Sequence, residues 1–306
     1  MDGILVVDKP AGPTSHDVVD RVRRAIGLRR VGHTGTLDPL ATGVLPLVVG
    51  RATRLARFLT ATDKTYEAAI RLGIATDTYD STGRVAGPQA GTPGGTPPAA
   101  VVVVDREALE NALAGFVGTY RQVPPPFSAK KVDGVRAYAR ARQGAPVEPA
   151  AVDVTVHELA IESFDGSLVR IRVTCAPGFY VRALAHALGE RLGVGAHLEA
   201  LRRTRSGGFD ERQAIGLDTI EQEGTSALRR LLPLAHALLH LPAVTLTERG
   251  ARRAGHGAVL AADDFVEAAD PGAPGPVRLV GPDGRLVAIA RAGRDPGSLH
   301  PFVVMG

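Results

Sequence analysis

Hydrophobic residues recur at every second position in some segments of the chain, as in a β-strand, and at every third or fourth position in others, as in a helix. Residues 66–72 turn apolar side chains to one side at every second position, which predicts a half-buried strand. Residues 15–26 place them on one helical face, with Ser15 as the N-cap and Gly27 as the C-terminal stop. The same patterns predict further strands at 4–7, 154–156 and 168–174, and further helices at 105–116 and 179–192. Strands and helices are therefore mixed along the chain.

The pattern changes after Pro242, where the predicted elements become short and extended. Val277–Val280 and residues 285–290 flank Gly281-Pro282-Asp283-Gly284, which is typical of a β-hairpin, and residues 302–304 offer one more strand. We therefore predict two domains, 1–240 and 241–306, the second small and rich in β structure. A domain of that size is marginally stable alone, so we expect it to pack against the larger one.

Two segments rich in glycine and proline interrupt the larger predicted domain. In residues 87–98, eight of the twelve residues are Gly or Pro, which predicts a flexible surface insertion. Residues 32–50 combine glycines with many valines and leucines, which predicts a glycine-rich loop enclosed by apolar residues. A loop of this kind is suited to a buried site.

Asp38 is the residue of this loop best suited to chemistry. Glycines around it let the backbone approach a ligand closely, and its apolar neighbours are expected to desolvate the carboxylate, which makes it a usable nucleophile. The alternative is that Asp38-Pro39 only starts a type I turn. His33 in the same way either contacts a base or satisfies backbone groups. The residues alone leave both choices open.

Composition and charge narrow the class of protein. Of the 306 residues, 44 % are hydrophobic and 22 % are charged, which excludes a largely disordered chain. No apolar run is long enough to span a bilayer and no secretory leader is visible, so we expect a cytoplasmic protein without a membrane partner. Cys175 is the single cysteine, which agrees with a reducing compartment. The net charge of +4 favours a polyanionic partner.

Two other kinds of site are weakly supported. A phosphate-binding loop would require the G-x-x-x-x-G-K-[ST] pattern, and no lysine lies between Lys9 and Lys64. His236 and His240 are four residues apart but lack the glutamate of an H-E-x-x-H zinc site. We therefore expect no metal and no cofactor, and a metal- or ATP-dependent nucleotidyl enzyme is the weakest of the functions considered.

The run GHTGTLDPLATGVLPLVVGRAT at 32–53 resembles the catalytic motif of the bacterial TruB family of tRNA pseudouridine synthases. The resemblance extends from residue 4 to about 240 and favours a catalytic Asp38 over a simple turn. Further segments agree with that family in order: 7–10 with Thr14-Ser15, 64–66 followed by 72–73 and 76–78, Pro125 with 128–131 and 134–138, 178–182, 196–197, and 201–203.

The resemblance implies a fold and an activity. Members of the family isomerise uridine to pseudouridine at position 55, in the T-loop of tRNA, without metal or cofactor. The implied fold class is α/β (α+β), a pseudouridine-synthase fold with a mixed, largely antiparallel bent sheet and flanking helices. Residues 241–306 resemble the small β-rich PUA module usual in these enzymes. A tRNA-binding folding helper, in which catalysis is secondary, is the alternative function.

The resemblance also implies roles for individual residues around the target base. Asp38 resembles the essential catalytic aspartate, and Arg182 resembles the arginine that pairs with it. Tyr66 resembles the tyrosine that stacks on the flipped base and takes the C5 proton, with stacking alone as the alternative. Tyr180 and Leu201 are expected to line the uracil pocket.

Other residues are implied as RNA contacts. His33 resembles the histidine that fills space or contacts RNA where the base has left the stack, and Lys9 resembles a lysine that shapes the pocket floor. Lys130 and Lys131 lie in an RNA-gripping insertion at about 120–150. Phosphate contacts are expected from Arg202, Arg203 and Arg205. The implied partner is the T-arm stem-loop of tRNA, and we expect a monomer because no repeated or coiled-coil interface pattern appears.

Overall fold

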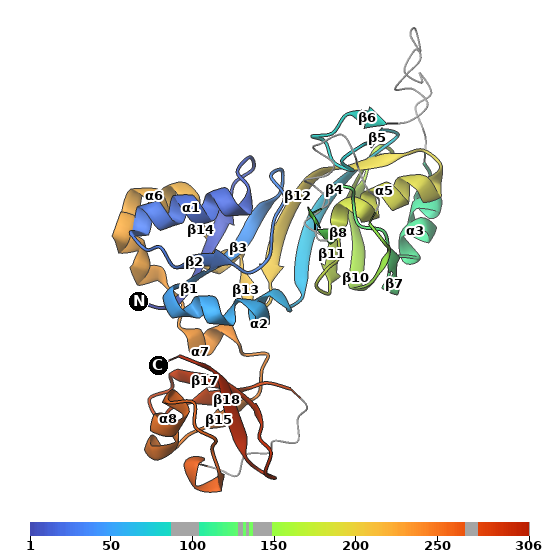
Figure 1. The fold of residues 1–306 in the computed structure, drawn as a ribbon. Helices are drawn as coiled ribbons and strands as arrows, with labels where there is room; N and C mark the ends of the chain where they lie inside the picture. The colour runs from blue at the N-terminus through green and yellow to red at the C-terminus, as the bar shows by residue number, and fades with distance from the viewer. Residues whose placement is uncertain (87–103, 128–130, 133–134, 137–148, 267–274, 306) are drawn as a thin grey trace. The chain divides into compact units, whose positions relative to one another are not determined.

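A computed structural model of the chain describes residues 1–86, 104–127, 131–132, 135–136, 149–266 and 275–305 (Figure 1). These residues form two compact units. Unit 1 comprises Met1–Leu37, Val44–Ala61 and Gly207–Gly306, and unit 2 comprises Asp38–Gly43 and Thr62–Ser206. The predicted insertion at 87–98 and Lys130 lie outside the described residues. None of the helices in the described part of the chain has the length and hydropathy that a bilayer span requires.

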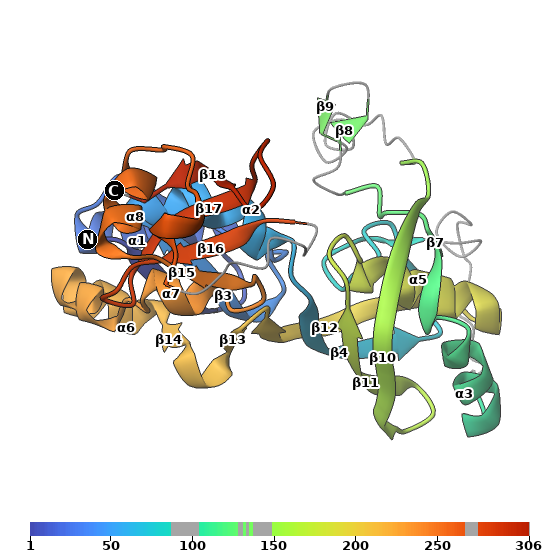
Figure 2. The ribbon, with the colours of Figure 1, turned by 90° about the horizontal axis from the view of Figure 1, so that it is seen from below.

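Unit 2 is built on five antiparallel strands. They lie side by side in the order β12-β4-β11-β10-β7 (Figure 2). β4 and β11 confirm the strands predicted at 66–72 and 168–174. Burial alternates along β11, whereas β4 is buried at every position except Glu67 and Arg71, and β10 is much longer than the predicted 154–156. The bounds are β4 Lys64–Leu72, β7 Gly118–Gln122, β10 Val152–Phe164, β11 Leu168–Cys175 and β12 Ala196–Ser206.

Two helices and two short hairpins complete the described part of unit 2. α3 (Arg106–Ala114) begins after Asp105, whose side chain accepts a hydrogen bond from the amide of Ala108 at 2.7 Å. α5 (Val181–Leu192) begins after Tyr180 and ends at Gly193, in the left-handed conformation at φ 69°. Both predicted helices are confirmed. The hairpin strands are β5 Ala75–Thr76, β6 Val85–Ala86, β8 Lys131–Val132 and β9 Val135–Arg136.

Before its C-terminal sheet, the described part of unit 1 contains the helix α1 (Ser15–Ile26) and five strands. The prediction of Ser15 as N-cap is wrong by one residue, because the Thr14 side chain caps the helix through the amide of Asp17. Ser15 is instead buried in the first turn, where its hydroxyl bonds to both backbone groups of Leu37. The strands are β1 Gly3–Lys9, β2 Val31–His33, β3 Thr42–Val49, β13 Phe209–Asp210 and β14 Ile215–Gly216.

The prediction of one continuous loop at 32–50 is wrong for most of its length. Residues 42–49 form β3, whose residues from Gly43 onward are all buried, because a run of Val and Leu satisfies a strand covered on both faces. β2 pairs with it in antiparallel register. Only residues 34–41 remain as a loop, and it contains a turn in which the amide of Ala41 donates to the carbonyl of Asp38 at 3.1 Å.

The remaining helices of unit 1 are short, and α1 packs on α6. The 3-10 helix η1 and α2 follow β3 directly, and the others precede the C-terminal sheet. Their bounds are η1 Gly50–Leu55, α2 Ala56–Thr60, η2 Glu211–Gln213, α6 Leu217–Glu223, η3 Gly224–Arg230 and α7 Leu234–Ala237.

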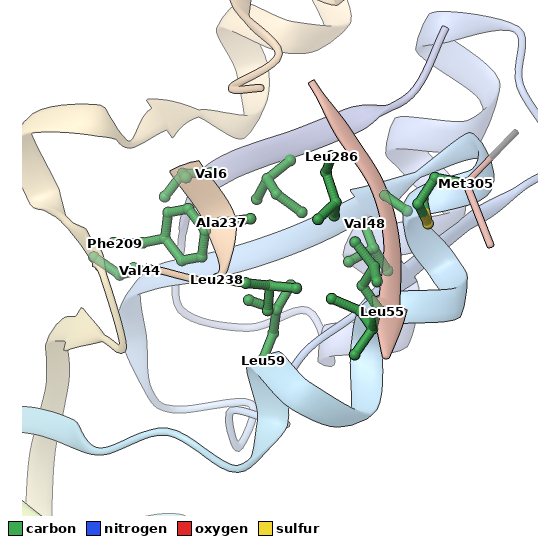
Figure 3. Packing of buried hydrophobic residues seen from close by; sticks show 13 residues of the cluster. Val6, Val44, Val48, Leu55, Leu59, Phe209, Ala237, Leu238, Leu286 and Met305 are labelled. Atoms are coloured by element: carbon green, nitrogen blue, oxygen red, sulfur yellow. The ribbon is translucent and has the colours of Figure 1, made fainter. Parts of the chain in front are cut away.

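The C-terminal residues form a four-stranded sheet in the order β15-β16-β17-β18, which confirms the predicted hairpin between β16 and β17. Leu286 of β17 and Met305 pack with Val44, Val48 and Leu55 in one buried cluster (Figure 3). This shared core confirms that the small sheet packs against other residues of unit 1. The domain boundary at 241 stays a prediction. The bounds are β15 Ala243–Thr245, α8 Glu248–Gly255, η4 Ala262–Asp264, β16 Val277–Val280, β17 Leu286–Ala292 and β18 Leu299–Val304.

Candidate active site

Asp38 and Arg182 form a bidentate ion pair within unit 2. Arg182 Nε donates to Asp38 Oδ2 at 2.8 Å, and Arg182 Nη2 donates to Asp38 Oδ1 at 2.9 Å. The arginine side chain is 5 % exposed and the aspartate side chain is 33 % exposed. A planar guanidinium held in this way fixes the plane of the carboxylate. The structure thus presents an oriented carboxylate that a ligand can reach.

The Arg182 guanidinium also donates hydrogen bonds to two backbone carbonyls. Nη1 donates to the carbonyl of Thr78 at 3.1 Å, and Nη2 donates to the carbonyl of Phe127 at 3.0 Å. The carboxylate of Asp80 lies 3.7 Å from Nε and is itself buried. A buried cation is tolerated where carboxylates and carbonyls replace its hydration in this way.

Asp80 is the residue of this network that the sequence analysis did not assign. Its Oδ1 atom accepts hydrogen bonds from Thr78 Oγ1 at 2.8 Å, from the amide of Thr82 at 3.0 Å and from Thr82 Oγ1 at 2.6 Å. An aspartate followed two residues later by a hydroxyl residue and then by Gly83 is a signal for such an Asx turn. The sequence signal was present but indicated only a turn.

The first residues of β3 hold the segment that carries Asp38 beside β12. Thr42 and Gly43 pair with Arg202 and Arg203 of β12 in parallel register, and Thr42 Oγ1 donates to the carbonyl of Leu201 at 3.4 Å. Asp38 also starts a turn, as its carbonyl bond to Ala41 shows. The two interpretations of Asp38 are therefore compatible, because the turn is what presents the carboxylate.

Tyr66 lies on β4, between Val173 of β11 and Arg203 of β12. The residue is 8 % exposed. Burial raises the pKa of the Tyr66 hydroxyl, while the positive charge of Arg203 and a hydrogen bond from its side chain act in the opposite direction. The phenol is therefore protonated at neutral pH, and its oxygen can accept a proton only after it has lost its own, as a phenolate that Arg203 stabilises.

Arg203 is not a surface phosphate contact, and that prediction is wrong. Its side chain is 1 % exposed and lies beside Tyr66. Residues 202 and 203 point to opposite faces of β12 because successive side chains of a strand alternate. Arg202 is half-buried, while Arg205 is exposed and donates to Thr65 Oγ1 at 3.2 Å.

Arg203 belongs to a small group of buried polar side chains on the central strands. Burial, and secondarily the charge of Arg203, lowers the pKa of the Lys64 ammonium to about 8. Lys64 Nζ donates to the carbonyl of Thr62. Burial raises the pKa of the Cys175 thiol to about 12, so this cysteine is an inert thiol at neutral pH.

Tyr180 and Leu201 are also placed in unit 2 by rigid elements. The amide of Tyr180 donates to Gln122 Oε1 at 2.9 Å, and its carbonyl accepts from Gln122 Nε2 at 3.1 Å, which fixes the residue at the start of α5. Leu201 is buried on β12, opposite Ala68 of β4. Their roles stay predictions.

The other predicted contacts belong to unit 1, to the short strand β8, or to residues that the structure does not describe. Lys9 and His33 belong to unit 1. The Lys9 ammonium is buried and donates to the carbonyl of Pro10 at 2.9 Å, and His33 Nδ1 accepts from the amide of Gly35 at 3.4 Å. Lys131 lies in β8, and Lys130 is not described.

A metal or cofactor site does not emerge from the described side chains. No three His, Cys, Asp or Glu residues among them gather as ligands of a metal ion would. Burial, and secondarily the charge of Arg278, lowers the pKa of the His240 imidazole. Arg278 donates to the carbonyls of Leu241 and Ala235, which gives this region a structural role.

Comparison with known families gives this geometry its context. The model of the TruB family pseudouridylate synthase (N terminal domain) matches residues 23–181, and that of the tRNA pseudouridylate synthase B C-terminal domain matches residues 182–239. Two curated relatives are both called tRNA pseudouridine synthase B. The protein from Thermobifida fusca is 46 % identical over 99 % of this chain and 98 % of its own, and that from Solibacter usitatus is 44 % identical over 100 % of both.

Solved structures agree with the sequence matches. An H/ACA RNP bound to a substrate RNA containing 2′-deoxyuridine superposes with a TM-score of 0.72 at 25 % identity, covering 99 % of this chain and 85 % of that one. A Cbf5-Nop10-Gar1 complex superposes with a TM-score of 0.70 at 30 % identity, covering 95 % and 78 %. The fold is that of a pseudouridine synthase, which confirms the predicted fold class. The chain belongs to the TruB family of pseudouridylate synthases.

Proposed function

We propose that this protein isomerises uridine to pseudouridine at position 55, in the T-loop of tRNA, with Asp38 as the catalytic carboxylate. The observation that carries the proposal is the partly exposed Asp38 carboxylate, held on both oxygens by a buried arginine. The relatives named tRNA pseudouridine synthase B support tRNA as the substrate. The position within the tRNA rests on the resemblance of the motif around Asp38.

The reaction explains why an oriented carboxylate is needed. The N1–C1′ bond of the nucleoside breaks, the uracil rotates, a C5–C1′ bond forms, and C5 loses its proton while N1 gains one. Asp38 is placed to attack the base or C1′, or to assist formation of a glycal, and each route requires a carboxylate oxygen at a fixed position. Arg182 supplies that position and leaves one side of the carboxylate open.

The aromatic and apolar residues of unit 2 supply the pocket in this proposal. Tyr66 stacks on the detached uracil and gives its phenolic proton to N1, while the charge and hydrogen bond of Arg203 stabilise the phenolate that forms. The phenolate then accepts the C5 proton late in the reaction and returns to the phenol. Tyr180 and Leu201 line the remainder and exclude water. The support for this arrangement is that Tyr66 and Leu201 lie on adjacent strands and Tyr180 directly precedes the helix that carries Arg182.

Binding of the T-arm requires cations that contact phosphate and a base that leaves the stack. Arg202, Lys130 and Lys131 contact the RNA backbone, and His33 and Lys9 support the flipped nucleotide. Flipping costs a few kcal/mol, and less in a loop than in a duplex. The net charge of +4 supports a polyanionic partner.

The organisation of the chain follows from the same proposal. Residues 1–240 carry the catalytic domain and residues 241–306 a PUA-like domain, and the protein acts as a monomer in the cytoplasm. The four-stranded order β15-β16-β17-β18 and the confirmed hairpin support a separate small β module in the C-terminal residues.

The test is tritium release from a tRNA transcript that carries uridine labelled at C5. The wild type should release tritium, whereas Asp38→Asn should release none and should bind the tRNA within about threefold of the wild type, because phosphate contacts dominate affinity. A transcript with cytidine at position 55 is the matched control and should release no tritium.

Wild-type activity in Asp38→Asn, or undiminished release from the control transcript, would overturn the proposal. The same variant separates catalysis from the alternative function. If a folding helper were the main activity, Asp38→Asn should still accelerate tRNA folding while the wild type released little tritium.

A further inference from the structure

Tyr79 has a backbone conformation that aromatic residues rarely adopt. Its φ is 65°, the only positive value at a non-glycine residue in the described part of the chain. Such a conformation persists only where the surrounding structure imposes it. The amide of Tyr79 donates to the carbonyl of Thr76 at 3.2 Å, and its own carbonyl accepts from the amide of Leu198 at 3.0 Å.

The ring of Tyr79 stacks face to face on the imidazole of His186. The ring centroids are 3.8 Å apart and the planes differ by 5°. Burial lowers the pKa of His186 against the opposite effect of Glu190, so the imidazole is neutral at neutral pH. Its Nδ1 atom is buried and makes no hydrogen bond to any described residue. The contact is therefore one of two neutral rings.

Both chain neighbours of Tyr79 contact Arg182. The carbonyl of Thr78 accepts from Arg182 Nη1, and the carboxylate of Asp80 lies 3.7 Å from Arg182 Nε. His186 follows Arg182 by four residues in α5, so the two side chains lie one turn apart on the same helical face. The stack thus ties the loop that holds the guanidinium to the helix that carries it.

Open space borders this stack on one side. Tyr79 and His186 line a cavity of about 370 Å³, together with Phe116, Tyr120 and Glu190. Side chains beside a cavity lose the packing that would otherwise confine them. The contact between the two rings therefore acts beside the backbone hydrogen bonds of Tyr79 in determining where the loop at 78–80 lies.

We propose that Tyr79 and His186 are positioning residues, which act through Arg182 to set the orientation of the Asp38 carboxylate. This inference rests on the proposed function of Asp38. Neither ring takes part in the chemistry. Their stack keeps the carbonyl of Thr78 and the carboxylate of Asp80 in place on Arg182, and removal of either ring shifts the guanidinium and with it the catalytic oxygen.

The kinetic test compares variants that keep a ring with variants that lose it. Tyr79→Leu and His186→Ala should lower the single-turnover rate of tritium release about 10- to 100-fold, the loss expected from misplacing a catalytic group by about 1 Å. Their affinity for tRNA should stay within about threefold. Tyr79→Phe and His186→Phe keep both rings and should react within about threefold of the wild type.

Two further variants test whether loss of the ring stack, and not another effect of the substitution, slows the reaction. Tyr79→Gly removes the ring and also relieves the backbone strain, so it should be as slow as Tyr79→Leu if the ring is what matters. Phe116→Leu removes an aromatic side chain from the same cavity wall without touching the loop, and should keep the wild-type rate. A slow Phe116→Leu, or a Tyr79→Leu variant that is folded and fully active, would overturn the proposal.

A measurement without substrate tests the coupling between the Tyr79–His186 stack and Arg182. The Nε–H of Arg182, buried and bonded to Asp38, should give a ¹⁵N resonance that exchanges slowly with water, assigned by its absence in Arg182→Lys. Tyr79→Leu should shift this resonance and speed its exchange, whereas Phe116→Leu should not. An unchanged resonance in Tyr79→Leu would contradict the proposal. If the wild type released no tritium, the proposed function would fail, and this measurement would still judge the coupling.

Discussion

Gly43 lies directly against the backbone of Arg203. A Cβ atom placed on Gly43 would be 2.3 Å from the carbonyl oxygen of Arg203, and the φ of Gly43 is +97°. No residue with a side chain fits this position without moving the strand. The close approach of β3 to β12 at this point, five residues after Asp38, therefore depends on the missing side chain of one glycine.

Gly43→Ala should be strongly destabilising. Gly73 is the matched control, because its φ is +92° and none of the described atoms lies within 4 Å of the position that a Cβ would take there. Gly73→Ala should cost about 1 to 2 kcal/mol from backbone strain alone, and Gly43→Ala should cost about 2 kcal/mol more from the steric overlap. Urea unfolding of both variants measures the difference. Equal losses would show that the contact with Arg203 relaxes freely.

Asp38 and Arg182 form an ion pair, but removal of the aspartate should destabilise the protein less than removal of the arginine. Asp38→Ala leaves Arg182 with the carboxylate of Asp80 and two carbonyls, so we expect a loss of about 1 kcal/mol in the free energy of unfolding. Arg182→Met leaves the buried Asp80 without its cation and should cost about 3 kcal/mol. Both variants should be inactive in tritium release.

Chemical denaturation at pH 7 checks this order of stabilities. Arg212→Met is the control, because the Arg212 side chain is fully exposed in its ion pair with Asp210, so its loss should leave the free energy of unfolding nearly unchanged. If Asp38→Ala were as costly as Arg182→Met, Asp80 would not act as the second counter-ion of the buried arginine.

Local sequence patterns predict the three longest helices and several of the strands, but they miss β12 and do not show how the elements meet. Gly27 and Gly193 end their helices as expected, because a left-handed residue after a helix has a strong local preference for glycine. The strand at 42–49 escapes the local pattern because Gly43 and Pro46 suggest a loop, whereas burial and pairing with strands distant in the sequence decide the outcome. That information is tertiary and is not contained in the local pattern.

The candidate active site shows the same limit, because local sequence patterns do not contain tertiary information. The motif around Asp38 and its resemblance to a family indicate the pair with Arg182, and the geometry agrees. Asp80 could not be assigned because its pattern fits an ordinary turn equally well. The prediction for Arg203 is wrong because adjacent arginines in a basic protein suggest a surface, while strand alternation turns one of them inward.

Lys64 should make the stability of the protein depend on pH in an unusual direction. Its pKa is about 8 in the folded protein, because burial and the charge of Arg203 disfavour the ammonium, and about 10.5 in the unfolded chain. Between these values the unfolded state binds more protons than the folded state, so the contribution of Lys64 to stability rises with pH. Below pH 8 both states are protonated, and the full cost of the buried charge remains.

Lys64→Met removes this charge and keeps a side chain of similar length. The variant should therefore be more stable than the wild type at pH 7, and its advantage should shrink steadily as the pH rises from about 8 to about 10.5. Urea midpoints of both proteins at intervals of one pH unit measure the difference. An advantage of Lys64→Met that stayed constant or grew over the same range would show that the Lys64 ammonium is not destabilised by its surroundings.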